Sequence, residues 1–460
     1  MIMTTTIERK SSQRWLSTVG GTVVMALLVS TCTSDGHSTQ TWSVDSPEVT
    51  INSPASCAMA GCVGEGIDTS AGAYRSEMED LLFPPGLFGI ELVRAYRSDS
   101  ETVGWFGRGW STIYETTLRV DGNDLTIDAP LGLAPFWAPE VPAGWDVAGT
   151  PTIGQVEGGY TLTWPTSEQW VFGSDGWLET LRSPYGASVT IEHTADAITL
   201  ASTQGVTIAL NVDGGRVVSA DTNDARHSEY TYAGDLLTDV SAPGIELGYR
   251  YSGGGLLAEV TAPAGTTAIA YTDGKVATQR TVSGQRFTFT YDGATTNVQS
   301  SGPDAAFVHD DESRLIRLTY DNKDVLVQSF DPNGLLVSRM EYALPSGQVV
   351  SSLERAYVDG RLTTETVNGT TSTISYDPRG RVAEVAGPSS IRFEYEDEGP
   401  LPATVTTPAN GRSTFSYRDG FVATVTDATG VASITNRDAL GNATGVGNTT
   451  DALWLYEYDS

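Results

Sequence analysis

Apolar and polar residues alternate in short segments over the second half of the chain, and one type of segment recurs along it. In the clearest copy, residues 371–376 alternate as the side chains of a half-buried strand do. Asp377, Pro378 and Gly380 then favour a turn, and a second short apolar stretch follows at 382–385. A unit of strand, turn and strand is too small to bury its own apolar face. The pattern therefore predicts an all-β array of stacked hairpins.

The leading aromatic residues of these units keep a regular interval of 19 or 20 residues within each group. They stand at Tyr232, Tyr251, Tyr271 and Tyr291, then at Tyr357, Tyr376 and Tyr395, and further copies lead with Tyr417 and Tyr458. A fixed period near twenty residues is the signature of a repeat architecture. Between residues 292 and 350 the period slips, and the sequence assigns no clear unit there.

After each turn the apolar residues recur three positions apart, as in Leu237 and Val240 or Val382 and Val385. A regular strand alternates with a period of two, so this spacing indicates a β-bulge or a sharp twist. Helices are disfavoured because glycine and proline recur too often. Large sheets of this kind twist and curl. We therefore expect a spiralling array of twisted β-hairpins over residues 166–460, partial or open in form.

The copy that runs from Tyr376 to Val385 reads Tyr-Asp-Pro-Arg-Gly-Arg and ends in valine. It resembles the YD repeat of the Rhs family, which includes bacterial polymorphic toxins, shell subunits of insecticidal toxin complexes and the animal teneurins. The resemblance implies a shell-like fold and structural roles for the repeat residues. In this sequence these are Tyr376, Asp377, Gly380 and Arg381, together with Tyr417 and Gly420 of a degenerate copy.

Residues 66–165 resemble the module that opens many Rhs proteins, followed by an insertion rich in proline and tryptophan. The resemblance rests on a Pro-Pro-Gly run at 84–86, an Arg-x-Tyr-x-Ser run from Arg94 and a Gly-x-Gly-Trp run from Gly107. It implies structural roles for Arg94, Tyr96, Gly107, Gly109 and Trp110. The tryptophans of this module leave two interpretations open, which are buried packing and an aromatic carbohydrate site.

Residues 1–32 combine a basic start with an apolar stretch at 19–29, as an export signal does. Three outcomes stay open here: lipidation of Cys32 at a lipobox-like sequence, ordinary signal cleavage, or an uncleaved anchor. Residues 33–65 are rich in Ser, Thr and Pro and predict a tether. If Cys32 takes a lipid, Cys57 and Cys62 can form a disulfide in an oxidising compartment. Their spacing is poor for a zinc site.

The charge balance is strongly acidic, with 57 acidic against 27 basic residues and a net charge of −30. Nucleic-acid binding is therefore disfavoured, since the phosphate backbone would be repelled. The sequence contains no nucleophile elbow, zincin motif, phosphate loop or EF-hand loop, and its four histidines lie far apart. We predict no catalytic residue, no cofactor and no metal site. Membrane contact is expected only through the N-terminal signal or a lipid.

Together these features predict an exported, non-catalytic shell or scaffold protein, either the N-terminal part or a truncated relative of an Rhs-type polymorphic toxin. The resemblance implies a self-cleaving aspartyl segment and a variable toxin after the repeats, and neither is visible in this sequence. The expected partners are a toxin passenger or a C-terminal shell partner. The alternative function is a cell-surface interaction or carbohydrate-binding lipoprotein, which would bind a surface glycan or protein.

Overall fold

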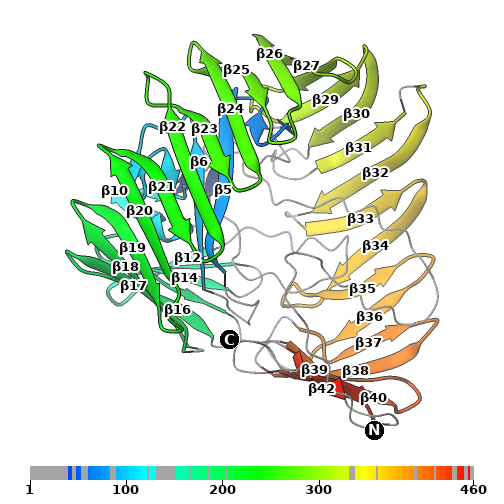
Figure 1. Cartoon of the computed structure of the whole chain (residues 1–460). Coiled ribbons are helices and arrows are strands. Elements are labelled where there is room, and N and C mark those ends of the chain that lie inside the picture. Colours follow the sequence, from blue (N-terminus) through cyan, green and yellow to red (C-terminus); the bar gives the residue numbers. More distant parts are fainter. Residues whose placement is uncertain are drawn as a thin grey trace.

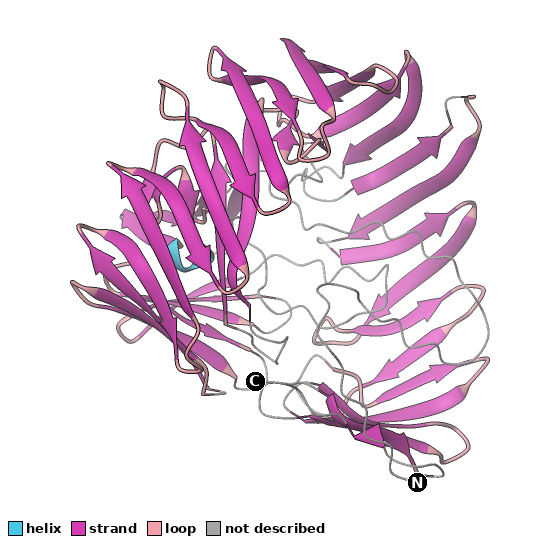
Figure 2. Cartoon of the chain, viewed as in Figure 1, coloured by secondary structure: helices cyan, strands magenta, loops and turns pink. Residues whose placement is uncertain are grey.

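The computed structural model describes residues 40–43, 48–52, 61–82, 90–121, 124–130, 152–164, 168–183, 187–203, 205–330, 337–344, 346–358, 361–396, 401–418, 421–437, 443–449 and 454–455. Strands form nearly all of the regular structure in these residues (Figure 2). The helical part of the described chain is the short 3-10 turn η1, Ile113–Glu115. The predicted all-β fold is confirmed.

One sheet of 31 strands, β12 to β42, dominates the molecule. Each strand pairs with the next one in the sequence, and the sheet curls into an open spiral (Figure 1). Its first half contains β12 (Thr152–Val156), β13 (Gly159–Thr163), β14 (Gln169–Gly173), β15 (Leu178–Arg182), β16 (Ser188–His193), β17 (Ala197–Ser202), β18 (Thr207–Asp213), β19 (Arg216–Thr222), β20 (His227–Ala233), β21 (Leu236–Ala242), β22 (Ile245–Tyr251), β23 (Leu257–Ala262), β24 (Gly265–Thr272), β25 (Lys275–Arg280), β26 (Arg286–Asp292), β27 (Thr295–Gln299), β28 (Ala305–His309), β29 (Leu315–Tyr320) and β30 (Lys323–Phe330).

The second half of the sheet continues the same antiparallel order. It contains β31 (Val337–Ala343), β32 (Val349–Val358), β33 (Arg361–Val367), β34 (Thr370–Tyr376), β35 (Val382–Ala386), β36 (Ile391–Glu394), β37 (Thr404–Thr407), β38 (Gly411–Arg418), β39 (Phe421–Thr426), β40 (Ala432–Arg437), β41 (Ala443–Asn448) and β42 (Trp454–Leu455). The strands of residues 292–350 belong to this order, so the array is continuous where the sequence period slips. The array also begins at Thr152, earlier than the predicted residue 166, because 152–163 form a further hairpin.

Three smaller sheets precede the array in the sequence. The first contains β3 (Cys62–Val63), β4 (Ile67–Asp68), β5 (Ala73–Leu82), β6 (Glu91–Arg97) and β9 (Trp110–Ser111), and the second contains β7 (Val103–Gly104) and β8 (Gly107–Arg108). The third contains β1 (Gln40–Ser43), β2 (Glu48–Asn52), β10 (Thr117–Asp121) and β11 (Asp124–Asp128). We call β3 to β11 the opening module. The stretch predicted as a tether, residues 33–65, contributes β1, β2 and β3, and β2 pairs in parallel with β11.

A register shift stands directly before the leading tyrosine of many hairpins. In the pair β20 and β21, Tyr230 lies opposite Val240, whereas Tyr232 lies opposite Leu237. The extra residue places both apolar residues after the turn on the face that carries the tyrosines, which explains their three-residue spacing. The same shift precedes Tyr251, Tyr271, Tyr357, Tyr376 and Tyr417. The β-bulge interpretation of the sequence is confirmed.

The leading tyrosines also join successive hairpins. In each case the hydroxyl donates a hydrogen bond to a backbone carbonyl of the preceding hairpin, near the start of its second strand. The pairs are Tyr232 with Val217 (2.6 Å), Tyr271 with Leu257 (2.7 Å), Tyr291 with Val276 (2.8 Å), Tyr357 with Val337 (3.0 Å), Tyr376 with Leu362 (2.7 Å), Tyr395 with Val382 (2.8 Å) and Tyr417 with Pro402 (2.7 Å). The repeated tyrosine is therefore a fixed link between units.

We call the face that carries these tyrosines the inner face. The opening module lies against it in the first half of the array, where β5 and β6 are drawn in blue behind green strands (Figure 1). The buried core that includes the module continues to Leu326. Two positions before the leading tyrosines, Tyr230, Tyr249, Ile269 and Phe289 of the first half are buried. In the second half Phe393 is also buried, whereas Ile374 and Phe415 are half-buried. The described residues contain no comparable layer over β31 to β42.

The tyrosine links predict the effect of removing one hydroxyl. Tyr376→Phe should destabilise the hairpins β33 to β35 by about 1 kcal/mol, since the Leu362 carbonyl loses its donor while the ring stays in place. Hydrogen exchange resolved by segment measures this, because a repeat array loses stability locally. Tyr342→Phe is the control, as no hydrogen bond of its hydroxyl is present among the described residues. Equal protection in both variants would contradict a structural role for the link.

Candidate site at the junction of the opening module and the array

A buried ion pair lies at the centre of the junction. Strand β6 places Arg94 beside Asp80 of β5, and both side chains are fully shielded from solvent. Arg94 Nη2 donates to Asp80 Oδ1 at 2.8 Å, and Arg94 Nε donates to the other carboxylate oxygen at 2.5 Å. The Tyr230 hydroxyl of the array donates to Asp80 Oδ2 at 2.8 Å. One carboxylate thus receives donors from both parts of the chain.

Aromatic rings enclose the Arg94 guanidinium. Its central carbon lies 4.6 Å from the Trp110 ring centre, 5.6 Å from those of Phe106 and Tyr230, and 5.9 Å from that of Tyr249. Burial alone would lower the pKa of Arg94, but the neighbouring Asp80 carboxylate outweighs it and raises that pKa. The guanidinium is therefore charged, and the ring faces add cation–π attraction to the ion pair.

Further contacts of the opening module fix its position on the array. The Tyr96 hydroxyl accepts a hydrogen bond from Leu257 N at 2.9 Å, and Trp110 Nε1 donates to the Tyr251 hydroxyl at 3.0 Å. Arg108 N donates to the Asp235 carbonyl at 2.8 Å. Each of these contacts joins a strand of the module to a hairpin of the first half of the array.

The glycines of this region allow close backbone approach. A Cβ atom at Gly107 would lie 2.5 Å from the Asp235 carbonyl oxygen, and one at Gly109 would lie 2.9 Å from the Arg97 carbonyl oxygen. Both residues also have positive φ angles, +94° and +76°. The structure therefore brings together the five opening-module residues that the sequence singles out: Arg94, Tyr96, Gly107, Gly109 and Trp110. Arg94, Tyr96, Gly107 and Trp110 contact the array, whereas Gly109 allows close packing within the module.

Glu115 is a buried acid that sequence reasoning does not identify. Its two carboxylate oxygens accept hydrogen bonds from Trp105 N at 2.7 Å and from Thr112 N at 2.8 Å. Burial raises the pKa of Glu115 to about 7, against the opposing effect of these two donors. The carboxylate clamps the β7–β8 hairpin to the turn η1. It titrates near neutral pH, so this clamp responds to pH.

The repeat motif fixes its own turn through hydrogen bonds between Asp377 and Arg381, and we call this pair of residues the lock. The Asp377 carboxylate accepts hydrogen bonds from Arg379 N and Arg381 N, both at 2.9 Å, and from Arg381 Nε at 2.8 Å. Burial opposes ionisation, but the Arg381 bonds outweigh it and lower the pKa of Asp377. Gly380 has a positive φ of +84° in this turn. The Arg381 guanidinium lies 4.0 Å from the Tyr395 ring centre and so reaches the next unit.

These contacts give Tyr376, Asp377, Gly380 and Arg381 structural roles in the array. Tyr417 makes the link to Pro402. Gly420 lies outside the described residues.

Several repeat units lack the leading tyrosine, and one of them is led by a histidine that a search based on tyrosine does not find. His309 occupies the leading position, and its Nδ1 lies 3.2 Å from the Ala294 carbonyl oxygen, where other units have a tyrosine hydroxyl. Asp310 and Arg314 repeat the lock of Asp377 and Arg381, with Arg314 Nε donating to Asp310 Oδ2 at 2.7 Å. The Asp-x-x-x-Arg spacing is the signal in the sequence that would have identified this unit.

The cysteine predictions fall mostly outside the described residues. Cys62 is disulfide-bonded. Cys32 and Cys57, its two candidate partners, both lie outside the described part of the chain. The Cys57–Cys62 pair and the lipidation of Cys32 therefore stay predictions.

Within the described residues, no group of three His, Cys, Asp or Glu side chains is placed to hold a metal ion. The same part of the chain contains no helix with the length and apolar character that a membrane span requires.

Comparisons with known proteins give one family match and several structural likenesses. A family model described as "Domain of unknown function (DUF6531)" matches residues 64–132, which contain most of the opening module. A search of curated proteins gives no match. Among solved structures, the chain is similar to the TcdB2-TccC3 complex, with 11% identity and a TM-score of 0.36 over 84% of this chain and 23% of that one.

Two related structures give similar values. The TcdB2-TccC3-Cdc42 complex has 10% identity and a TM-score of 0.33, over 82% of this chain and 26% of that one. The Photorhabdus luminescens Tc holotoxin pore has 10% identity and a TM-score of 0.34, over 81% and 26%. This chain therefore spans about a quarter of the length of the structures that it matches. At such identity the likeness concerns the fold.

The Arg94–Asp80 pair predicts a strong coupling between two substitutions. Arg94→Met should destabilise the protein by about 3 to 5 kcal/mol, because Asp80 is left as a buried charge without its cation. Asp80→Asn in the same chain should recover a large part of this loss, since the amide oxygen still accepts the Tyr230 hydroxyl. A double-mutant cycle measured by chemical denaturation tests the coupling. Additive losses would show that the two charges act independently.

The raised pKa of Glu115 predicts a pH-dependent stability. The unfolded carboxyl titrates near 4.5 and the folded one near 7, so between these values the folded protein holds a proton that the unfolded chain has released. Stability from this group is therefore greatest below about pH 4.5 and decreases as the pH rises to about 7. Relative to Glu115→Gln, the free energy of unfolding of the wild type should decrease by on the order of 3 kcal/mol across this pH range.

Chemical denaturation at a series of pH values measures this difference. Glu192→Gln at an exposed site is the control and should follow the wild type. Parallel curves for the wild type and Glu115→Gln would mean that Glu115 does not titrate in this range.

Proposed function

We propose that this protein is a non-catalytic scaffold that holds a polypeptide partner on the inner face of β31 to β42. The observation that carries the proposal is the difference between the two halves of the array. In the first half the opening module buries the inner face, whereas in the second half the described residues leave Ile374 and Phe415 at the equivalent positions half-buried. A repeat array needs a cover over such a surface.

The chemistry of this surface favours an apolar partner. Ile374 and Phe415 face inward from β34 and β38, next to Tyr376 and Tyr417. The hydroxyls of both tyrosines already donate to backbone carbonyls of the array. The inner face therefore presents aliphatic side chains and aromatic ring surfaces to a partner, because these tyrosine hydroxyls are already used as hydrogen-bond donors within the array. The resemblance to Rhs proteins favours a toxin passenger or a C-terminal shell partner as the polypeptide.

Export of the protein is part of the proposal. Its support is the signal-like sequence of residues 1–32 and the disulfide of Cys62, since disulfides persist mainly in oxidising compartments. A non-catalytic role is proposed because the buried charged side chains make structural contacts. Arg94 pairs with Asp80, and Glu115 joins two turns. For the alternative function, carbohydrate binding, Trp110 offers no support because it is 1% exposed.

Native mass spectrometry of the full chain, purified without denaturant from the cells that produce it, tests the proposal. We expect the complex to contain a bound polypeptide. We also expect a mature N-terminus that lacks the signal sequence. An added mass on Cys32 would indicate lipidation, and its absence would indicate ordinary signal cleavage. Ile374→Asp and Phe415→Asp should each reduce the bound fraction at least about tenfold, as a charge in an apolar contact does.

Ser375→Asp and Ser416→Asp are the matched controls, because these neighbours on the same strands point to the exposed outer face. They should leave the bound fraction unchanged. A chain that carries no polypeptide, or inner and outer variants that behave alike, would contradict the scaffold function.

A further inference from the structure

Three aromatic rings meet at the rim of the junction between the opening module and the array. Trp105 lies at the tip of the β7–β8 hairpin, Trp177 in the turn between β14 and β15, and His193 at the end of β16. Trp105 and Trp177 are nearly parallel, with ring centres 6.3 Å apart and planes at 27°. His193 lies 5.4 Å from Trp105 and 5.2 Å from Trp177. We call these three residues the rim cluster.

The backbone holds both tryptophans in place. Trp105 N donates to Glu115 Oε1 at 2.7 Å, and its carbonyl accepts a hydrogen bond from Val217 N at 2.8 Å. Trp177 N donates to Asp175 Oδ1 at 3.2 Å, and its carbonyl accepts from Gly173 N at 2.9 Å. Rings on a clamped backbone bind a ligand with little loss of conformational freedom, so the cluster is preorganised.

The rim cluster lies at the edge of the core, and Trp105 packs against that core while staying partly exposed. Phe106, the neighbour of Trp105, is 0% exposed and packs against the Tyr230 ring at 5.0 Å, so the hairpin tip already has a buried anchor. Trp105 and Trp177 remain partly exposed, and His193 is exposed. Large aromatic side chains that stay partly in solvent beside polar groups are typical of binding surfaces.

Polar groups border the rings. Partial burial lowers the pKa of His193, and the Asp175 carboxylate only partly opposes this, so the imidazole is neutral at neutral pH. A neutral imidazole has one N–H donor and one acceptor nitrogen. In the described residues the His193 ring nitrogens have no hydrogen-bond partner, and the Asp175 carboxylate stands nearby as a further acceptor. The surface therefore combines apolar ring faces with a donor and acceptors at their edge.

We propose that the rim cluster is a binding site for a neutral carbohydrate. A pyranose ring has one face of C–H groups that can stack on tryptophan and a circumference of hydroxyls that both donate and accept hydrogen bonds. The rim cluster offers the complementary arrangement. The inference is independent of the scaffold function, because the cluster lies on the first half of the array and the partner surface on the second.

Other ligands that stack on aromatic rings fit less well. An organic ammonium ion is held between ring faces that enclose it. Here the three rings contact one another, so they do not surround a cation. Nucleobases also stack on tryptophan, but the net charge of −30 opposes their phosphate backbone. Acidic sugars meet the same repulsion at Asp175.

Titration calorimetry of the full chain with a panel of soluble oligosaccharides tests the inference. The probes are β-1,4-linked glucose and N-acetylglucosamine oligomers, an α-1,4-linked glucose oligomer, polygalacturonate as the acidic comparison and tetramethylammonium as the cation. We expect at least one neutral oligomer to bind and the acidic and cationic probes not to bind. Trp177→Ala should weaken binding of the neutral oligomer at least about tenfold, as loss of a central aromatic contact does.

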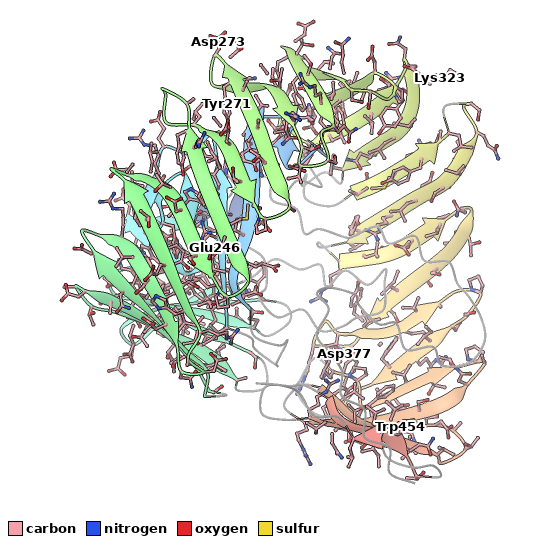
Figure 3. The ribbon with its side chains drawn as sticks, in the orientation of Figure 1. Glu246, Tyr271, Asp273, Lys323, Asp377 and Trp454 are labelled. Carbon is pink, nitrogen blue, oxygen red and sulfur yellow. The ribbon has the colours of Figure 1, made fainter. Side chains whose placement is uncertain are left out.

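Two variants keep the result interpretable. Trp177→Phe retains an aromatic ring and should bind more tightly than Trp177→Ala. Trp454→Ala removes an exposed tryptophan on the last strand of the array, labelled in Figure 3, and should bind as the wild type does. Circular dichroism confirms that each variant is folded. The inference is wrong if none of the neutral oligomers binds, if tetramethylammonium is the probe that binds, or if folded Trp177→Ala retains wild-type affinity.

Discussion

The ion pair between Arg94 and Asp80 is the contact on which the junction of the two parts depends. Removing two charges from water costs more free energy than their mutual attraction supplies, unless further hydrogen bonds and contacts stabilise the pair. The Tyr230 hydroxyl supplies a donor from the array, and the Trp110 ring supplies a face from the opening module. The Tyr230 bond to Asp80 therefore forms only when module and array are docked in one position. An apolar contact of equal area would tolerate a shift that this pair does not.

The position fixed at the junction continues along the array through the tyrosine links. Each linking hydroxyl reaches back to the preceding hairpin, so these units are placed by the hairpin before them. In many units a β-bulge precedes the tyrosine, and in the β20–β21 hairpin it brings Tyr232, Leu237 and Val240 onto one face. The Asp377–Arg381 lock serves the same purpose, since Arg381 also contacts the Tyr395 ring of the next unit. Bulge, link and lock together account for a period near twenty residues.

The sequence predicts the hairpin array well because its interactions are local and periodic. The three-residue spacing of Leu237 and Val240 is sufficient to identify the bulge. The docking of the opening module cannot be predicted in this way, since Asp80 and Tyr230 meet across 150 positions and no spacing encodes that contact. The rim cluster cannot be predicted from the sequence for the same reason, because its three residues are far apart in the chain. The unit led by His309 is a different case, because its Asp and Arg keep the spacing of the lock and only the aromatic residue differs.

The two halves of the array share one pattern but have different surroundings, and this contrast supports a partner. Tyr249 and Ile374 hold equivalent positions before a bulge, yet Tyr249 is 3% exposed and Ile374 is half-buried. Local sequence cannot explain the difference, whereas the opening module does. Strand pairing and tyrosine links already join the hairpins of the second half, so Ile374 and Phe415 need not be apolar for that purpose. Their apolar character instead fits a contact with a surface that the described residues do not provide.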